Sequence, residues 1–389
     1  MNRGLAKTPP MGWNSWNMFG PRVDEEKIRS TADTLVDKGM KDLGYSYVVI
    51  DDCWTVKDGR GADGRLVPDP VRFPSGIKAL ADYVHSKGLK LGIYSDAADK
   101  TCAGYPGSYG HERTDAAQWA SWDIDFLKYD YCNAPWDQAA AIDRYRRMGE
   151  ALASCGREIL FSLCEWGGRS PHLWGRDVGG SMWRASGDIF DSWVDVWVHP
   201  EGGVGYYGLG IDTNIELAAR VAEYGGPGGW NDLDMLVVGL KGKGQIEGLG
   251  LSPFEYRTHM SIWSIACSPL FIGCDITDMD TDTEEILTNP HVLAVNQDSL
   301  GIAGKRILRR NGCDIFRKPL KDGTAAFAVV NRGTGPADCD FSAGELGLLD
   351  TAKTVFDIWK GGDAAEFGER IKVKIEAHET KYWIIRYGK

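Results

Sequence analysis

The sequence predicts a (β/α)8 barrel followed by a small antiparallel β-sandwich. Between about residues 10 and 298, eight short apolar segments alternate with amphipathic stretches, a pattern typical of βαβ units and a parallel sheet. Eight strands in this length fit a closed barrel better than a doubly wound sheet, and no G-x-G-x-x-G motif opens the first helix. After Ser299 the helical stretches stop, so we divide the chain into a barrel, 1–300, and a sandwich, 301–389.

The elements follow in chain order. The predicted barrel strands are Gly12–Ser15, Tyr45–Ile50, Leu89–Tyr94, Ile124–Tyr129, Ile159–Cys164, Met182–Ala185, Gly229–Asn231 and Leu270–Ile272. The predicted helices are Asp24–Lys41, Ile77–Ser86, Gln138–Ser154, Asn214–Tyr224, Pro253–Ala266 and Thr283–Ala294. In the tail, turns rich in Gly, Asp and Pro separate the predicted strands Cys313–Arg317, Ala325–Asn331, Thr354–Asp357, Ile371–Ile375 and Tyr382–Arg386.

Composition excludes several classes of function. A formal charge of −11 over 389 residues disfavours nucleic acid and anionic membranes as partners. No apolar run approaches 18 residues, and residues 1–16 lack the apolar stretch of a signal peptide. The nine cysteines form neither CxxC pairs nor a zinc-spaced cluster. We therefore expect a globular protein without a structural zinc site.

The carboxyl ends of the predicted strands carry acidic and aromatic residues. These ends hold Trp16, Asp51-Asp52-Cys53-Trp54, Tyr94 with Asp96, Lys128-Tyr129-Asp130, Cys164-Glu165-Trp166, Arg184 with Asp188, and Asn231-Asp232 with Asp234. After any single strand, an acidic residue is more often a turn residue or a helix cap. At least five strand ends deliver a carboxylate to the same rim, and that is where such barrels build their active sites.

Such a rim fits two kinds of site. Several Asp oxygens can bind Mg²⁺ or Ca²⁺, or they can accept hydrogen bonds from sugar hydroxyls while two carboxylates do the chemistry. Lys128 precedes Asp130 by two residues and faces the same side of its strand. Its ammonium disfavours a bound dication, and the Trp residues suit the C–H faces of sugars. Glycoside hydrolysis without metal or cofactor is our preferred hypothesis, and metal-dependent hydrolysis is the second.

Seven motifs lie in order along the predicted barrel. They are Pro10–Trp16, Gly44–Trp54, Lys87–Tyr94, Thr101–Gly104, Phe126–Asp130, Gly228–Asp232 and Ala294–Asp298. Together they resemble the melibiase family of α-galactosidases, glycoside hydrolase family 27. The resemblance implies a retaining, exo-acting enzyme that hydrolyses terminal α-D-galactosyl residues. It implies that Asp130 is the nucleophile and Asp188 the acid/base, with their carboxyl groups roughly 5–5.5 Å apart.

The resemblance also implies a galactose pocket. Its substrate-binding residues would be Trp16, Asp51, Asp52, Tyr94, Lys128, Cys164, Glu165, Trp166, Arg184 and Asp234. Asp51 and Asp52 would take the 4- and 6-hydroxyls. Asp130 is expected to stay ionised beside Lys128, and Asp188 to begin protonated so that it can donate to the leaving oxygen.

Two positions are expected to separate related substrates. In the family, a Glu at position 165 goes with a free 2-hydroxyl, whereas α-N-acetylgalactosaminidases carry a small residue there. Asp51 argues against the β-L-arabinopyranosidases, which carry a longer Glu. These two activities are the alternatives within the family. A catalytically silent galactose-binding protein is the alternative outside it, and the intact pair Asp130 and Asp188 argues against that alternative.

The cysteines differ from the family pattern. Cys102 and Cys132 match a family disulfide, whereas Cys53 and Cys164 lack their usual partners and are expected to be free thiols lining the site. The other five are expected to be small buried hydrophobic residues. Few pairable cysteines and no visible signal peptide favour a cytoplasmic over a secreted enzyme.

Two further segments depart from the family or stay outside its motifs. Leu233 stands where the family often has Pro, so the loop that carries Asp234 is expected to shift. Residues Trp197–Ile211 are rich in Gly and aromatic side chains and predict a mobile surface loop. A second hypothesis is that this loop borders the aglycone, with Tyr206 and Tyr207 as stacking platforms.

Overall fold

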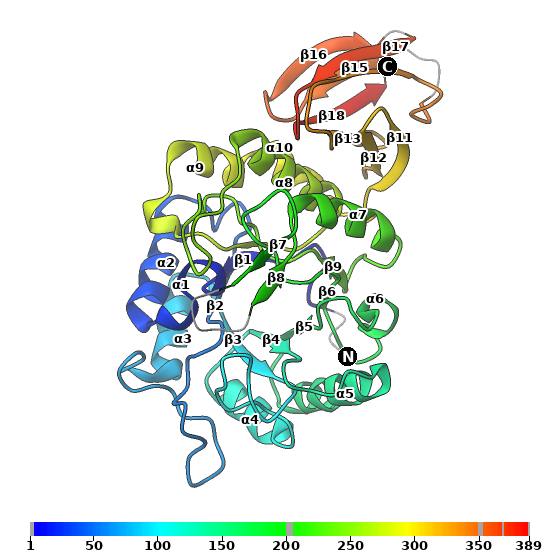
Figure 1. The fold of residues 1–389 in the computed structure, drawn as a ribbon. Coiled ribbons are helices and arrows are strands. Elements are labelled where there is room, and N and C mark those ends of the chain that lie inside the picture. The colour runs from blue at the N-terminus through cyan, green and yellow to red at the C-terminus, as the bar shows by residue number, and fades with distance from the viewer. Residues whose placement is uncertain (1–3, 200–204, 349–352, 368, 388–389) are drawn as a thin grey trace.

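A computed structural model describes residues 4–199, 205–348, 353–367 and 369–387. An eight-stranded parallel sheet wrapped by helices forms the larger part, and an antiparallel sandwich covers one flank of it (Figure 1). These two parts confirm the fold class that the sequence predicts, a barrel followed by a β-sandwich.

The barrel strands run in parallel, and each pairs with the next. They are β1 (Met11–Asn14), β2 (Tyr47–Val49), β3 (Lys90–Asp96), β4 (Phe126–Asp130), β5 (Leu160–Cys164), β6 (Met182–Arg184), β9 (Trp230–Asp232) and β10 (Leu270–Ile272), with β10 beside β1. The exception is β9 and β10. In the described part of the chain a single bridge joins Leu236, which follows β9, to Ile272 of β10. The Leu236 amide donates to the Phe271 carbonyl at 2.7 Å, which brings the two ends of the sheet together.

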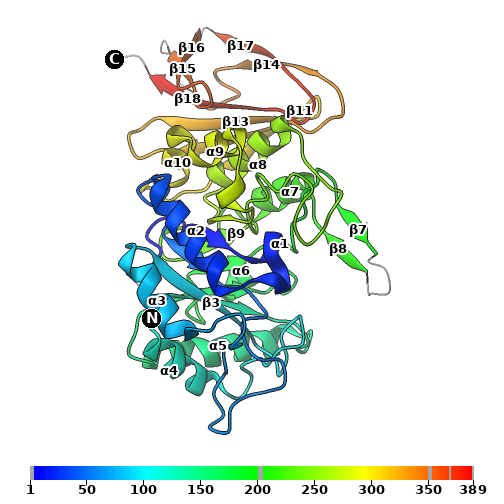
Figure 2. The same cartoon turned by 90° about the vertical axis from the view of Figure 1, so that its left-hand side faces the viewer.

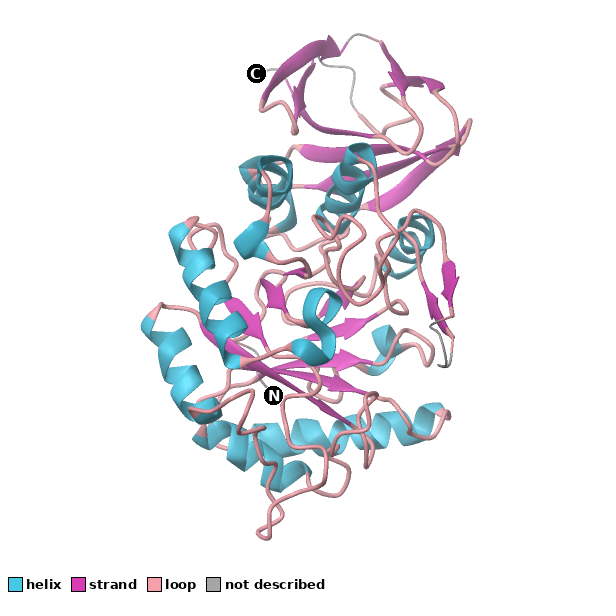
Figure 3. Ribbon diagram, turned by 60° about the vertical axis from the view of Figure 1, so that its left-hand side comes forward, coloured by secondary structure: helices cyan, strands magenta, loops and turns pink. Residues whose placement is uncertain are grey.

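Helices surround the sheet (Figure 3). They are α1 (Trp16–Phe19), α2 (Glu25–Asp37), α3 (Gly76–Ser86), α4 (Glu112–Ser121), α5 (Gln138–Ser154), α6 (Pro171–Trp174), α7 (Ile211–Val221), α8 (Pro253–Ile265), α9 (Thr281–Thr288) and α10 (Pro290–Asn296). Short 3-10 turns cover Gly20–Arg22 and Ile276–Asp278. Within the described ranges, no helix combines the length and the apolar character needed to span a bilayer.

Two of the differences from the predicted helices have a clear physical reason. The predicted helix Thr283–Ala294 is two helices, because Pro290 has no N–H to continue α9. The Asn289 side chain instead accepts the amides of His291 and Val292 and caps α10. Helix α4 was not predicted, because its buried side includes Glu112 and hides the apolar periodicity.

The sandwich packs two antiparallel sheets. One has the order β11 (Lys305–Arg310), β12 (Cys313–Pro319), β13 (Ala325–Asn331), β18 (Thr380–Tyr387), β15 (Lys353–Asp357) and β16 (Gly362–Phe367). The other pairs β14 (Ala337–Ser342) with β17 (Arg370–Ile375). Phe327, Phe341 and Ile385 are buried in a common core. Strand β11 was not predicted, because four of its six residues are Lys or Arg.

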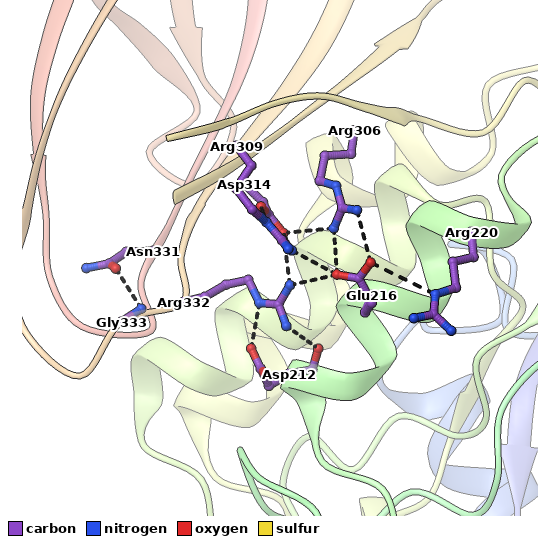
Figure 4. Close-up of polar contacts among 9 residues, drawn as sticks. All are labelled: Asp212, Glu216, Arg220, Arg306, Arg309, Asp314, Asn331, Arg332 and Gly333. Carbon is purple, nitrogen blue, oxygen red and sulfur yellow. Dashed lines mark hydrogen bonds and ion pairs between the residues drawn. The ribbon is translucent and has the colours of Figure 1, made fainter. Parts of the chain in front are cut away.

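Helix α8 joins the sandwich to the barrel (Figure 2). Thr258 shares a 2.8 Å hydrogen bond with Thr380, and Ser264 shares one of 2.9 Å with Tyr382. At one edge of this contact, arginines from the sandwich surround Glu216 of α7 (Figure 4). The sandwich therefore stabilises the outside of the barrel, on the flank formed by α7 and α8.

A hairpin of β7 (Val196–Val198) and β8 (Tyr206–Gly208) projects from the barrel and is seen at the side of the molecule in Figure 2. It lies within the segment predicted as a mobile loop, of which residues 200–204 are outside the described residues. For the described ends of that segment the loop prediction is wrong, because both are paired strands.

Candidate active site

A cavity of about 400 Å³ opens at the carboxyl ends of the barrel strands. Ten of the twelve residues predicted for catalysis and substrate binding line it: Trp16, Asp51, Asp52, Tyr94, Lys128, Asp130, Trp166, Arg184, Asp188 and Asp234. The volume is within the range of roughly 300–1,000 Å³ that small-molecule sites occupy. The sequence thus located most of the charged side chains of the wall.

Asp130, the last residue of β4, is buried at the base of this cavity. The Tyr94 hydroxyl donates to its Oδ2 at 2.9 Å, and the Tyr131 amide donates to its Oδ1 at 2.9 Å. Burial raises the pKa of Asp130 to about 6, although the nearby Lys128 charge opposes that rise and the Asp188 charge adds to it. The carboxylate is held in place by two donors, and no described residue forms a direct ion pair with it.

Lys128 bonds to Asp51 rather than to Asp130. Its Nζ lies 2.7 Å from Asp51 Oδ2, which also accepts the side-chain amide of Asn14 at 2.7 Å. The Asp52 amide donates to the other Asp51 oxygen at 2.9 Å. From the sequence we expected the ammonium beside Asp130 and did not predict Asn14. Side chains from β1, from β4 and from the segment after β2 meet only in the folded barrel.

A disulfide supports the wall next to Asp52. Cys102 is bonded to Cys132, as the resemblance implied, and this ties the loop after β3 to the end of β4. The neighbouring Ala103 amide donates to Asp52 Oδ2 at 3.0 Å, and the Cys53 amide donates to Oδ1 at 2.6 Å. Burial raises the pKa of the Asp52 carboxyl despite these donors. The disulfide thus positions a loop that contacts Asp52.

Arg184 connects two acidic residues on the opposite wall. Its guanidinium lies 3.0 Å from Asp188 Oδ1 and 3.0 Å from Asp234 Oδ1. The Ile189 amide donates to Asp234 Oδ2 at 2.7 Å. The Asp188 side chain is 59% exposed, so it lies at the open part of the cavity. Although Leu233 stands where the family often has Pro, the loop still places Asp234 on the wall of the cavity.

Two predicted residues lie outside the cavity. Cys164 lies beneath it inside the barrel, and its sulfur accepts from Arg184 Nη1 at 3.6 Å. Glu165 is fully buried, and its Oε1 lies 2.5 Å from Arg169 Nη1 and 3.0 Å from the Arg169 amide. Arg169 lies only four residues after Glu165, but the pattern of apolar residues that predicts the strands does not indicate this ion pair. The predicted role of Glu165 beside the 2-hydroxyl does not fit this geometry.

Three lining residues have a left-handed backbone at the ends of different strands. Cys53, Trp166 and Asp234 have φ values of 73°, 63° and 77°, which is uncommon for residues other than glycine. Cys53 is a free, buried thiol on the wall, as predicted. Outliers of this kind cluster at binding sites, where the surrounding structure holds the backbone in place.

The residues here do not suit a metal ion. In the described part of the chain, one group has metal-ligand types within 4.8 Å of one another: Asp96, Cys102, Asp130 and Cys132. Its two sulfurs are joined in the disulfide, whereas metals bind the thiolate. Both Asp96 oxygens already accept amide hydrogens, from Ala98 and Cys132. This geometry favours the sugar hypothesis over metal-dependent hydrolysis.

Some residues of the cavity wall were not predicted from the sequence. Gln245 lines the cavity, and its Nε2 donates to the Trp16 carbonyl at 2.6 Å across more than two hundred residues of chain. Phe190, Tyr206 and Tyr207 also line it. Only Tyr206 and Tyr207 were proposed from the sequence, as part of the aglycone hypothesis.

A (β/α)8 barrel whose mouth gathers carboxylates, hydrogen-bond donors and aromatic walls has the features that a glycoside hydrolase requires. Two family models match the chain, Alpha galactosidase A over residues 8–298 and the Alpha galactosidase C-terminal beta sandwich domain over residues 310–385. The chain therefore belongs to the melibiase-type alpha-galactosidase family.

Individual relatives agree with this assignment. An alpha-galactosidase of Cyamopsis tetragonoloba is 43% identical, over 98% of this chain and 87% of the relative. The structure of alpha-galactosidase I from Mortierella vinacea is 36% identical, with a TM-score of 0.90 over 100% of this chain and 99% of the other. An α-galactosidase structure from Saccharomyces cerevisiae with raffinose is 29% identical, with a TM-score of 0.89 and 99% of each chain covered.

Proposed function

We propose that this chain is a retaining, exo-acting α-galactosidase that hydrolyses terminal, non-reducing α-D-galactosyl residues. The observation that carries the proposal is the pairing of Asp130 and Asp188 on one cavity, with different surroundings. Asp130 is buried and oriented by Tyr94 and the Tyr131 amide. Asp188 lines the same cavity, and its side chain is 59% exposed. Two carboxylates with distinct roles are what glycoside hydrolysis requires.

The reaction proceeds in two displacements. In the first, Asp130 attacks the anomeric carbon while Asp188 donates a proton to the leaving oxygen, giving a β-linked glycosyl-enzyme. In the second, Asp188 takes a proton from water, and that water attacks the same carbon from the opposite face while the bond to Asp130 breaks and its carboxylate is released. The α-configuration is therefore retained. The Tyr94 hydroxyl donates to Asp130 Oδ2 and so keeps the carboxylate oriented for attack on the anomeric carbon.

The polar group around Asp51 recognises the sugar. Its oxygens, the Lys128 ammonium and the Asp52 carboxylate form a buried set of donors and acceptors at one wall. A sugar whose hydroxyl points elsewhere leaves a buried group unsatisfied, which costs about 1–3 kcal/mol. This is how the pocket distinguishes the axial 4-hydroxyl of galactose from the equatorial one of glucose. The raffinose bound to the Saccharomyces cerevisiae relative supports α-galactosyl oligosaccharides as the substrate class.

Hydrolysis of nitrophenyl α-D-galactopyranoside tests the proposal. We expect turnover of this substrate and much slower turnover of the matching α-N-acetylgalactosaminide and β-L-arabinopyranoside. Faster turnover of either alternative would reassign the sugar. A folded sample that binds galactose without turnover would support the silent binding protein, and activity lost with EDTA and restored with Mg²⁺ would support the metal hypothesis.

A further inference from the structure

The hairpin β7–β8 carries three large aromatic side chains that are more than half exposed. Trp197 is 56% exposed, Tyr206 52% and Tyr207 54%. Exposed aromatic groups gathered on one element mark an interaction site more often than scattered ones do. Tyr206 and Tyr207 also line the catalytic cavity, so the hairpin is continuous with the active site.

Backbone bonds fix the hairpin to the segment that carries Asp188. The Leu209 amide, directly after β8, donates to the Asp188 carbonyl at 2.8 Å, and the Phe190 amide donates to the Leu209 carbonyl at 3.0 Å. A Cβ added at Gly208 would lie 2.3 Å from the Phe190 ring, so this ring packs directly on the strand backbone. The base of the hairpin is therefore held against the proposed acid/base.

The two faces of the hairpin differ. Strand pairing sets Trp197 opposite Tyr207 and Val198 opposite Tyr206. Because side chains alternate along a strand, Tyr206 shares the Gly208 face, where Phe190 packs, and Tyr207 shares the other face with Trp197. The Tyr207 hydroxyl donates to Asp195 at 2.7 Å, and its ring lies 5.9 Å from that of Trp197. Both tyrosines line the cavity, but Tyr206 is the one that shares the Phe190 face, whereas Tyr207 is held by Asp195 and Trp197 on the other face.

We propose that Tyr206, together with Phe190, forms a subsite for the aglycone, and that its occupant is a sugar unit of an oligosaccharide chain. The inference rests on the proposed function, because it takes Asp188 to protonate the bond that joins galactose to this unit. A tyrosine ring offers a flat apolar face to sugar C–H groups and a hydroxyl to their oxygens. The subsite makes α-galactosyl oligosaccharides better substrates than galactosides with small aglycones.

The test compares Tyr206→Ala with a matched control, Trp197→Ala. Both changes remove a half-exposed aromatic ring from the same hairpin, but from opposite faces. The substrates are methyl α-galactoside, octyl α-galactoside and an α-galactosyl mannotriose. For Tyr206→Ala we expect kcat/KM on the mannotriose substrate to fall about three- to tenfold, mainly through KM, with no change on methyl α-galactoside. Trp197→Ala should change neither, and Tyr206→Phe should retain most of the preference.

Other outcomes overturn the subsite. An equal loss on methyl α-galactoside would mean that Tyr206 only supports Asp188. A larger loss on the octyl substrate than on the mannotriose substrate would assign the surface to an apolar aglycone. No change on any substrate would leave the hairpin without a binding role. Turnover of methyl α-galactoside by the unmodified protein tests the proposed function separately. If circular dichroism shows that Tyr206→Ala is unfolded, Tyr206→Leu takes its place.

Discussion

Charged side chains gather both at the barrel mouth and at the contact between barrel and sandwich, but acidic groups outnumber basic ones only at the mouth. Six Asp and three Lys or Arg line the mouth. At the domain contact, four arginines surround three acidic residues (Figure 4). Glu216 accepts hydrogen bonds from Arg306 at 2.7 Å, Arg309 at 2.8 Å and Arg332 at 3.1 Å. Every carboxylate at the contact has a cation.

The pKa values follow this difference. The three arginines hold the pKa of Glu216 well below its usual range. Hydrogen bonds from Arg309 and Arg332 likewise lower the pKa of Asp314, although its burial opposes them. At the mouth, burial raises the pKa of Asp130 to about 6. Carboxylates that are fully paired stabilise the fold, whereas under-paired ones cost stability and stay available to a ligand.

The largest expected effect is that of Asp130→Asn. If this carboxylate is the nucleophile, kcat/KM for an α-galactoside falls by at least about 10⁴-fold. The thermal unfolding midpoint should stay the same or rise, because the change removes a buried and unpaired charge. Steady-state kinetics and calorimetry on one preparation check both parts. Loss of activity together with a lower midpoint would place Asp130 with the structural charges instead.

Replacing the proposed acid/base has a smaller effect that depends on the leaving group. Asp188→Asn should lower kcat/KM by about 10²–10⁴-fold for an oligosaccharide, whose leaving hydroxyl needs a proton. For a dinitrophenyl galactoside, which leaves without protonation, the first step should be little affected. The ratio of the two kcat/KM values measures this. Equal losses on both substrates would contradict the role of Asp188 as the acid.

The same kind of change at the domain contact should act on stability alone. Glu216→Gln leaves three arginines without their shared anion and should lower the free energy of unfolding by about 1.5–3 kcal/mol, with kcat/KM unchanged. Because the pKa of Glu216 is lowered from 4.5, the difference is fully present above pH 4.5 and shrinks as the pH falls below it.

Arg220→Gln provides the control for that comparison. Arg220 is 70% exposed and lies 4.0 Å from Glu216, so its loss should cost less than about 1 kcal/mol. Urea unfolding of both variants measures the two costs. Reduced activity with an unchanged unfolding midpoint in Glu216→Gln would break the distinction between the two regions.

The last prediction concerns the dependence of kcat/KM on pH. Asp130 must be ionised to attack, and its pKa is raised from 3.8 to about 6. As the pH falls through 6 the protonated form accumulates, so kcat/KM should drop about tenfold per pH unit below that value. Tyr94→Phe removes a donor to the ionised form and should move this limb to higher pH. An acid limb near 3.8 would contradict the raised pKa.

Much of the site could be predicted because barrel strands deliver their last residues to one rim. Asp51, Asp130 and Arg184 follow from that rule and from the family motifs. Side-chain partners could not be predicted in the same way. Lys128 bonds to Asp51 and not to Asp130, and Glu165 pairs with Arg169. Neither partner could be predicted, because each depends on distances between side chains in the folded barrel.

The fold shows the same limit. The apolar barrel strands were predicted in order, since a buried parallel strand reads as a short apolar run. The hairpin was missed because its aromatic residues remain exposed and its pairing is local. The hairpin packs beside Asp188 through the contact between Phe190 and Gly208. The spacing of apolar residues in the sequence does not indicate this contact.

Azide rescue of Asp130→Gly tests the central claim most directly. Removing the buried carboxylate leaves space at the base of the cavity, where azide can attack the anomeric carbon from the face that Asp130 uses. With an α-galactoside that has an activated leaving group, we expect azide to restore turnover and NMR to identify the product as β-galactosyl azide. An α-galactosyl azide, or a variant that stays active without azide, would contradict Asp130 as the nucleophile.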